Sequence, residues 1–597
     1  MSGKTQPELT LRSLTTGVVL GILLTPCNIY SGLKIGWSFN MSITAALLSF
    51  GFWTLLHQLS LAKPWGLLES NINQTAASSS ASIISGGLVA PIPALALVSN
   101  IELPWYQLIV WVFTVSFFGI WVAYFLLTPF LIRSPLPLPA GVATAQVMQD
   151  IFSKGHEAIL RVYALGMSAL FAGLLKLVDS FWWQLPRFTL PGKLGASGAV
   201  STSVGGYSFK NLTFFLDPSP LLVGFGAIIG IRIGISLLLG AIISWGLIGP
   251  EILALGWVET GVDDPSASWF PCMVNWLLWP GVALMVTSSV ASFIFMLLPA
   301  KSTAGVKKDA SDTSPIERDS APSYKRGKLV YVGLLVACIL VVVVQMWLFD
   351  TPLYAALLAV PLAFVLAIVA GRVVGETGIP PIGAIGQVSQ LSMGMAAPGN
   401  MTSNLTTANV AGGTAGQCAD LLNDFKVGRI IHANPMSQVA AQCVGVITGS
   451  IIGSLTYLAL IPDPHTMLIS ETWPAPAVVT WKAVAETLKV GLSAIPDHAR
   501  LAMLAGMLVG LLLTILERIV ASKDAYLLPS GPALGLAFVI PASISVSMFF
   551  GATIAWLLGY FALSWSQRFI IAIASGFVAG ESIAGVGGAI MELVNNT

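Results

Sequence analysis

The sequence contains very little charge. Only 9% of its 597 residues are Asp, Glu, Lys or Arg, whereas 55% are hydrophobic. Because a soluble domain has about 25% charged residues, this chain is too poor in charge to cover a water-facing surface, and a soluble protein is excluded. Apolar runs of about 20 residues recur from end to end, each long enough to cross a hydrocarbon core about 30 Å thick. The composition predicts an all-α, polytopic integral membrane protein.

Paired cysteines, clustered histidines and nucleotide-binding motifs are lacking. The 5 cysteines and 5 histidines are scattered singly, so we predict neither a disulfide framework nor a site for a bare metal ion. No GxxxxGK[ST] phosphate loop occurs, which disfavours ATP-driven transport, and no HExxH motif occurs, which disfavours a zinc protease. The net charge of +1 gives no sign of a nucleic-acid partner. We predict that the protein is not an enzyme and has no cofactor, catalytic residues or metal ligands.

Apolar windows predict about sixteen transmembrane helices, about eight on each side of one hydrophilic loop. The predicted division is an N-terminal repeat at 1–298, a linker at 299–328 and a C-terminal repeat at 329–597. Two assignments stay open: 528–563 is broken by a proline and is consistent with two spans, and 481–496 is amphipathic and is interpreted as interfacial. The other windows are 14–36, 40–61, 66–98, 105–131, 136–152, 157–182, 220–249, 270–298, 329–349, 352–371, 376–398, 404–424, 432–461, 500–521 and 568–594.

The basic residues of the linker set the predicted orientation. Cytoplasmic loops carry an excess of Lys and Arg, so the linker is predicted to be cytoplasmic and, with about eight spans per half, both termini as well. The loops 99–104, 250–269 and 462–480 hold acidic residues and no Lys or Arg, and are predicted to lie outside. We expect a multi-pass protein of the cell inner (plasma) membrane. The basic residues of the linker are Lys301, Lys307, Lys308, Arg318, Lys325, Arg326 and Lys328.

The two halves resemble each other. Internal repeats are typical of secondary transporters, whose binding site lies at the repeat interface. Three motifs recur in the same order: Gly32-x-x-x-Gly36 with Gly371-x-x-x-Gly375, Ser70-Asn71-Ile72 with Ser403-Asn404-Leu405, and 137–141 with 528–533.

Two polar segments occupy corresponding places in the halves. Residues 69–87 and 400–424 are rich in Ser, Thr, Asn and Gln, and such side chains are costly when they face lipid. They are therefore either tightly packed helices whose hydroxyls bond to their own backbone, or the lining of a cavity for a polar solute. In the second interpretation the candidate substrate-binding residues are Asn71, Asn73, Gln74, Asn404, Thr407 and Asn409.

A proline pair interrupts a predicted span of the second half. Residues 375–378 precede Pro380 and Pro381, and Gln387 and Gln390 follow. Because proline prevents a continuous helix, we predict either a discontinuous or re-entrant helix, whose free backbone groups suit a charged ligand, or a plain kink. The two glutamines are further candidates for substrate binding.

Few ionisable residues lie inside the predicted spans. Lys34 and Arg372 occupy corresponding places in the halves and are either helix-end anchors or partners for a substrate carboxylate. Glu581 lies in the middle of the last span, where a partly desolvated carboxyl takes up a proton more readily than in water, as a proton carrier requires; a structural hydrogen bond is the alternative. Glu376 and Asp420 are the other candidates for proton coupling.

Together these segments resemble the oligopeptide transporter family, which includes the yellow-stripe-like metal-chelate transporters. The resemblance covers nearly the whole chain and rests on 28–36, on the Ser-rich segment 69–87, on 137–145 and on the closing motif Gly580-Glu581. Tyr30, in the first of these motifs, is a further candidate for substrate binding. The chain looks like the bacterial branch, because it is short of the large extramembrane additions of many eukaryotic relatives.

The resemblance implies proton-coupled uptake of small oligopeptides or peptide-like compounds, with metal chelates as the alternative substrates. We predict a secondary active transporter that works by alternating access, is driven by the proton gradient, and has protons, its substrate and the lipid bilayer as partners. A polar-solute channel is less favoured, because the duplication, the prolines and the buried carboxyl are typical of a transporter. The small-residue faces are also consistent with a homodimer.

Overall fold

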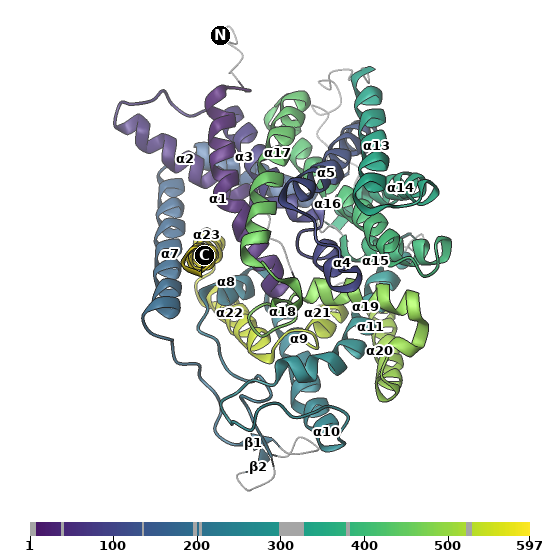
Figure 1. Cartoon of the computed structure of the whole chain (residues 1–597). Coiled ribbons are helices and arrows are strands. Elements are labelled where there is room, and N and C mark those ends of the chain that lie inside the picture. Colours follow the sequence, from purple (N-terminus) through teal and green to yellow (C-terminus); the bar gives the residue numbers. More distant parts are fainter. Residues whose placement is uncertain are drawn as a thin grey trace.

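The computed structural model describes residues 8–36, 41–133, 136–153, 155–194, 200–201, 206–297, 328–377, 382–520 and 528–596. Almost all of the secondary structure within these ranges is helical (Figure 1). The helices of the first half are α1 (Leu11–Ile35), α2 (Ser42–Gln58), α3 (Leu67–Ala81), η1 (Ser82–Gly86), α4 (Pro91–Ser99), α5 (Trp105–Leu127), η2 (Thr128–Arg133), α6 (Pro139–Ser153), α7 (Gly155–Phe181), α8 (Pro220–Ile229), α9 (Ile231–Ala241), η4 (Ile242–Ile248), α10 (Gly249–Ala254) and α11 (Phe270–Leu297).

The second half begins with α13 after the linker. Its helices are α13 (Lys328–Phe349), α14 (Leu353–Thr377), α15 (Ile382–Ala396), α16 (Met401–Ile431), α17 (Pro435–Leu460), α18 (Pro464–Met467), α19 (Pro476–Val490), η5 (Gly491–Ala494), α20 (Asp497–Ile519), α21 (Gly531–Leu536), α22 (Ala542–Phe561) and α23 (Leu563–Asn596).

A small antiparallel sheet lies in the connection between α7 and α8. Its strands are β1 (Lys193–Leu194), β2 (Val200–Ser201) and β3 (Tyr207–Ser208), in the order β2-β1-β3. The sequence analysis does not predict this sheet, because strands of two residues are too short to show an alternating pattern.

The prediction of an all-α, multi-pass membrane protein is confirmed. The described residues contain 12 helices or helical runs that are long and apolar enough to cross a membrane, and the count of about sixteen stays a prediction. Two predicted spans are shorter than expected, because α6 and α15 have 15 residues each, or about 22 Å of rise. The predicted span 404–424 lies within α16, a helix of 31 residues whose many polar side chains are almost all buried by protein.

Glycine and proline divide several of the predicted spans. The window 528–563 contains two helices, α21 and α22, and Pro541 is the N-cap of the second. The window 220–249 is divided between α8 and α9 at Gly230, whose φ of 84° favours glycine. The proline pair Pro380–Pro381 lies outside the described residues. The segment predicted to be interfacial, 481–496, belongs largely to α19, which packs on α4, α15 and α16.

The helices form two bundles, and each bundle contains helices from both halves of the chain. The first bundle consists of α1–α6 with α13–α17 and α19, and the second of α7–α11 with α20–α23 (Figure 1). The bundles meet where α1 and α17 contact α23, where α2 and α6 contact α7, and where α15 and α19 contact α11. The division of the sequence at the linker is therefore not a division in space.

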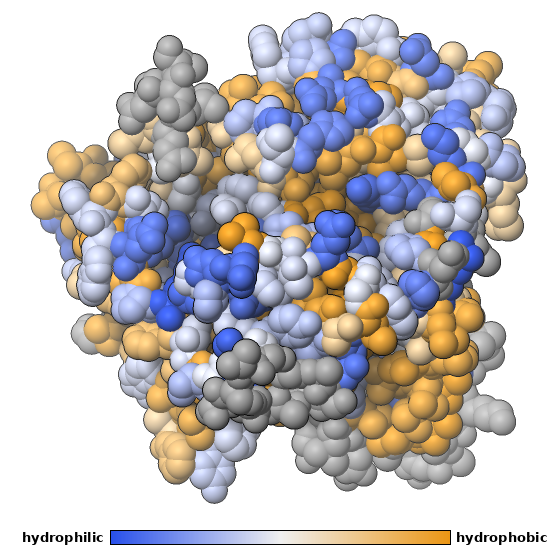
Figure 2. Space-filling model, turned by 60° about the horizontal axis from the view of Figure 1, so that its bottom comes forward, coloured by the Kyte–Doolittle hydropathy of each residue, from blue (hydrophilic) through white to orange (hydrophobic). Residues whose placement is uncertain are grey.

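The outer helices turn apolar side chains outward, as a membrane protein requires. Leu170 on α7, Val343 on α13 and Leu508 on α20 are examples of exposed apolar residues. Figure 2 shows hydrophilic residues gathered over the middle of the face turned forward, with hydrophobic residues toward its left edge and lower right.

Candidate functional site

Glu581 on α23 is held at the N-terminus of α8. Its carboxylate oxygens accept hydrogen bonds from Ser219 Oγ at 2.7 and 2.8 Å, and Oε2 also accepts from the backbone N–H of Leu221 at 2.8 Å. Lys34 Nζ lies 4.0 Å from Oε1. Glu581 is 1% exposed. The carboxylate thus faces two hydrogen-bond donors, a cation and the N-terminus of a helix, which are the groups that bind an anion.

One face of α1 brings Lys34 to this carboxylate. Cys27, Tyr30 and Lys34 follow one another at helical spacing. The Sγ of Cys27 is 3.8 Å from the carbonyl oxygen of Ala579, and the Tyr30 ring lies 5.7 Å from Lys34 Nζ. Tyr30 also packs edge-on against Trp473, with ring centroids 5.3 Å apart. Because α1 belongs to the first bundle and α23 to the second, the contacts of Cys27 with Ala579 and of Lys34 with Glu581 join the bundles.

A small charged cavity lies beside the carboxylate. Its volume is about 50 Å³, and one water molecule takes about 30 Å³ of liquid. In this conformation the cavity is large enough for a water molecule, which could carry a proton, and too small for a peptide. Its charged lining residues are Lys34, Lys176, Arg187, Asp179, Asp217 and Glu581.

The two polar segments found in the sequence pack against each other, α3 and η1 against α16. Gln74 Nε2 donates to Asp424 Oδ1 at 2.6 Å. Further along the interface between these helices, Gln417 on α16 donates to Ser79 Oγ at 3.3 Å and accepts from Ser85 Oγ at 3.4 Å. The segments thus form a buried polar seam between two helices rather than facing lipid.

Predicted residues on α15 and on the first half of α16 bond to neighbouring helices. Asn404 Nδ2 donates to the carbonyl oxygen of Gln390 at 2.6 Å, and Gln390 Nε2 donates to the carbonyl oxygen of Trp481 at 3.1 Å. Thr407 Oγ1 accepts from Gln345 Nε2 at 3.3 Å. These contacts tie α13 and α15 to α16, and α19 to α15.

Six of the predicted residues keep unpaired polar atoms although their side chains are buried. Both amide atoms of Asn71 and of Asn73, and the side-chain oxygens of Gln74, Gln387, Gln390 and Asn404, have no hydrogen-bond partner among the described residues. Asn409 differs, because its Oδ1 accepts from Trp111 Nε1 at 2.7 Å. Buried polar groups are costly unless water or a ligand pairs with them, so the unpaired amides mark positions where a polar solute or water would bind.

The predicted site residues lie in three groups rather than around one cavity. The first is Tyr30, Lys34 and Glu581 at the bundle junction; the second is Asn71, Asn73 and Gln74 on α3 with Asp420 on α16; and the third is Gln387, Gln390, Asn404, Thr407 and Asn409. Asn404 and Asp420 are about 24 Å apart along α16 at 1.5 Å per residue. Arg372 is exposed on α14, and the side chain of Glu376 lies outside the described residues.

Sequence reasoning missed several residues of these groups. Ser219, Asp217 and Arg187 come from the connection before α8, which carries no motif. A signal was present, because Ser219-Pro220 before an apolar run is a typical N-cap followed by proline at the first helical position, and a helix N-terminus attracts a carboxylate. Asp424 was also missed, although it lies one turn after Asp420 on the same helix.

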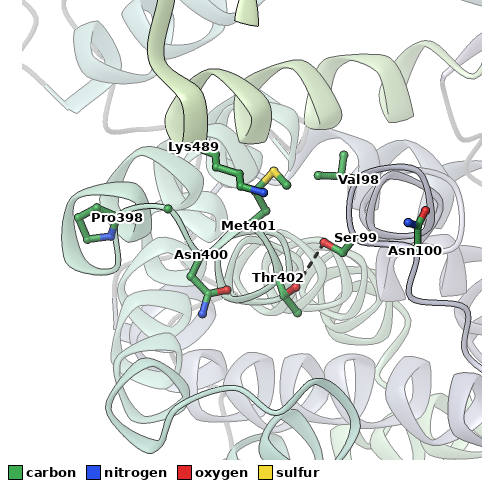
Figure 3. A pocket seen from close by; sticks show the side chains of 9 residues that line it. Val98, Ser99, Asn100, Pro398, Asn400, Met401, Thr402 and Lys489 are labelled. Carbon is green, nitrogen blue, oxygen red and sulfur yellow. Dashed lines mark hydrogen bonds between the residues drawn. The ribbon is translucent and has the colours of Figure 1, made fainter. Parts of the chain in front are cut away.

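A wider depression opens where α4, α16 and α19 meet (Figure 3). Its volume is about 670 Å³. Figure 3 shows Lys489 reaching over the start of α16, where Asn400 and Thr402 lie, while Ser99 and Asn100 form the end of α4. Thr402 Oγ1 and Ser99 Oγ are 3.3 Å apart.

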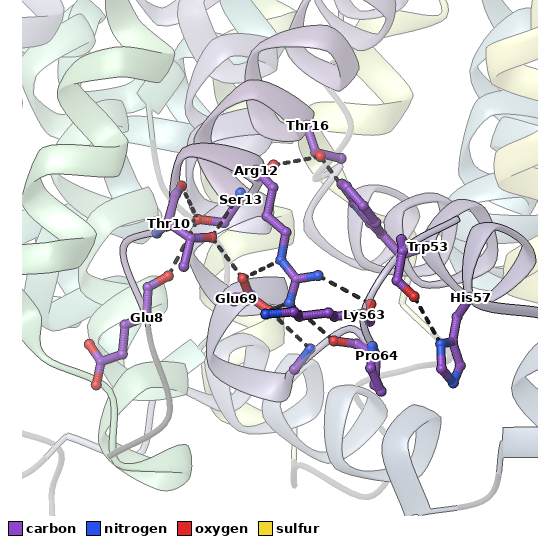
Figure 4. A network of polar contacts seen from close by, with 12 residues as sticks. Glu8, Thr10, Arg12, Ser13, Thr16, Trp53, His57, Lys63, Pro64 and Glu69 are labelled. Carbon is purple, nitrogen blue, oxygen red and sulfur yellow. Dashed lines mark hydrogen bonds and ion pairs between the residues drawn. The ribbon is translucent and has the colours of Figure 1, made fainter. Parts of the chain in front are cut away.

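Arg12 ties the start of α1 to the start of α3 (Figure 4). Its guanidinium pairs with the Glu69 carboxylate, and also donates to the carbonyl oxygens of Lys63 and Pro64 at 3.2 and 3.0 Å. It lies 5.3 Å from the ring centroids of both Trp53 and Trp65. Glu69 is 3% exposed, so this is a largely buried ion pair.

Replacing Arg12 with Ala is expected to lower the free energy of unfolding by about 3 kcal/mol, because it leaves a buried carboxylate without its cation. The matched control is Arg568→Ala. Arg568 pairs with Glu157 at 3.6 Å, and the side chains of the two residues are 54% and 38% exposed. Exposed pairs contribute little. The melting temperature of the purified protein should fall by several degrees for Arg12→Ala only, and equal values for the two variants would contradict the expectation.

A family model described as OPT oligopeptide transporter protein matches residues 8–591. The chain belongs to the oligopeptide transporter family. The resemblance seen in the sequence motifs is confirmed by this match, and assignment to the bacterial branch stays a prediction.

Relatives within the oligopeptide transporter family match over almost their full length. The chain is 25% identical to "Putative oligopeptide transporter YGL114W" of Saccharomyces cerevisiae, over 97% of this chain and 95% of the relative. It is 25% identical to "Probable metal-nicotianamine transporter YSL8" of Arabidopsis thaliana, over 96% and 85%. It is 23% identical to "Metal-nicotianamine transporter YSL1" of the same plant, over 99% and 93%. All three names describe transporters and none describes an enzyme.

Proposed function

We propose that this member of the oligopeptide transporter family is a secondary active transporter that takes up small oligopeptides or peptide-like compounds together with protons, by alternating access. The observation that carries the proposal is the position of Glu581, a buried carboxylate on one bundle that meets Lys34 on the other. An ionisable group at a moving junction couples its protonation to the movement, because a proton that binds one conformation better shifts the population toward it.

The contacts of Glu581 suggest how its protonation would act. In the described conformation the charged carboxylate binds Lys34, Ser219 and the N-terminus of α8. A protonated carboxyl would lose its attraction to Lys34 and to the helix dipole, so protonation favours a conformation in which α1 and α23 separate. Because such coupling is reciprocal, the movement that admits substrate would also bind the proton. The proton gradient is then the energy source, and no cofactor is required.

The packing of the helices also supports two pseudo-repeats. α1 packs on α3 as α14 packs on α16, and α3 packs on α17 as α16 packs on α5. These pairings match the recurring sequence motifs on α1 and α14 and on α3 and α16. In the proposed orientation both termini and the linker are cytoplasmic and the protein lies in the cell inner (plasma) membrane. A homodimer through small-residue faces remains part of the proposal.

Import of metal chelates is the second candidate function. It is favoured by the names of the plant relatives, which describe metal-nicotianamine transporters. Within the described residues there is no group of three or more His, Cys, Asp or Glu side chains that could hold a metal ion. A metal would therefore travel as a complex that is recognised through its organic ligand.

Uptake into proteoliposomes tests the proposal. Labelled di- to tetrapeptides, glutathione and an iron–nicotianamine complex would be offered with and without an inward proton gradient. A one-unit pH gradient supports about tenfold accumulation for each proton carried, since each unit is worth about 1.4 kcal/mol. Accumulation of a peptide only with the gradient is the expected result. Accumulation of the chelate alone would favour the second function, and equilibration regardless of pH would contradict symport.

A further inference from the structure

The depression between α4, α16 and α19 is rich in hydrogen-bond donors and has a single charge. Of the residues that line it, only Lys489 is charged. Lys489 is exposed, and no carboxylate of the described residues lies within 4.0 Å of its ammonium, whereas Lys482 on the same helix pairs with Glu486 at 3.9 Å. The depression therefore presents an unpaired positive charge.

The start of α16 adds donors on the floor of the depression. Asn400 is the N-cap, and its side chain accepts from the N–H of Ser403 at 2.9 Å. The first intrahelical bond runs from the N–H of Asn404 to the carbonyl oxygen of Asn400, so the N–H groups of Met401 and Thr402 precede it and have no partner within the helix. A helix of 31 residues also places about half a positive charge at this end. An anion is the ligand that these groups favour.

A buried amide marks the inner end of the depression. A narrow recess continues from it and shares Gly399, Asn400, Met401 and Lys489 with it. Asn404, which is 3% exposed, lines this recess. Its Nδ2 donates to Gln390, but its Oδ1 has no hydrogen-bond partner among the described residues. An unpaired buried acceptor requires a donor, and the recess, with a volume of about 10 Å³, has room for one water molecule at most.

We propose that this depression binds the carboxylate end of a peptide-like substrate. Lys489 and the first-turn N–H groups of α16 bind the carboxylate, and a water molecule in the recess bridges Asn404 Oδ1 to the ligand. The ligand class rests on the proposed function. In the proposed orientation the depression faces outward, because it lies beside the loop 99–104, and so it captures substrate before transport.

Binding of two matched peptides to the purified full-length protein tests the proposal. The probes are trialanine and its C-terminal amide, measured by titration calorimetry. Wild type should bind the acid about tenfold more tightly than the amide, because a charge-assisted hydrogen bond is lost with the carboxylate. Lys489→Gln should weaken binding of the acid about tenfold and leave the amide unchanged, whereas Lys489→Arg should keep most of the preference. The matched control, Lys482→Gln on the same helix, should behave as wild type.

The outcomes separate this inference from the proposed function. Equal affinities of wild type for acid and amide, or the same preference in wild type and Lys489→Gln, would overturn the carboxylate site even if gradient-driven uptake is found. A preference that depends on Lys489, without any effect of a proton gradient on uptake, would support the site and overturn symport. Failure of wild type to bind either peptide would overturn the site for peptide carboxylates.

Discussion

Replacing Glu581 with Gln is expected to abolish uphill uptake while substrate binding and exchange persist. With a one-unit inward pH gradient, wild type should accumulate substrate up to about tenfold per proton, and the variant should reach only the external concentration. The side chain of Gln has almost the same shape and keeps one oxygen to accept from Ser219, but it cannot release or take up a proton. The substitution also removes the negative charge that lies 4.0 Å from Lys34 Nζ.

Two measurements distinguish a coupling role of Glu581 from a structural one. Exchange of labelled for unlabelled substrate across the membrane needs no net proton movement, so a variant impaired only in coupling still exchanges. The matched control is Glu259→Gln, which removes an exposed carboxylate in the connection before α11 and should accumulate as wild type does. Accumulation at the wild-type level by Glu581→Gln would remove this carboxylate from the coupling mechanism.

Glu581 could be singled out because a carboxyl in the middle of an apolar run is easily seen in a sequence. The residues that contact it could not be predicted. Ser219 and Leu221 lie about 360 residues away along the chain, and hydropathy indicates which residues avoid lipid, not which helices they meet. For the same reason the sequence predicts two repeats but not that the bundles combine α1 with α17 and α8 with α22.

The arrangement of the polar residues shows a second limit of sequence reasoning. The composition of 69–87 and 400–424 predicts that these segments avoid lipid. Their packing against each other agrees with this prediction. A single cavity lined by both does not follow, because α16 is long enough to carry Asn404 and Asp424 to places about 30 Å apart. The sequence places Lys489 in a helix interpreted as interfacial, since nothing in its own segment reveals the α16 terminus beside it.

The contact between α7 and α23 depends on glycines that precede Glu581. A Cβ atom on Gly580 would lie 2.0 Å from the carbonyl oxygen of Ala169, and one on Gly576 would lie 2.0 Å from Ser168 Oγ. Small residues of this kind let membrane helices approach closely. The atoms that a Cβ on Gly580 would meet belong to the backbone of Ala169. Backbone atoms cannot rotate away as a side chain can.

Gly580→Val is therefore expected to separate α7 from α23 and to destabilise the protein by at least about 3 kcal/mol, the upper range for an overpacked core. Because Glu581 is the next residue, its carboxylate would also leave Ser219. The matched control is Gly587→Val on the same helix, where an added Cβ meets nothing within 4 Å and valine is slightly better than glycine in a helix. Size-exclusion profiles of the purified variants should show folded protein for Gly587→Val and mainly aggregate for Gly580→Val. Equal yields of monodisperse protein would show that α7 and α23 are not packed this closely, and the placement of Glu581 against α8 would then lose its structural basis.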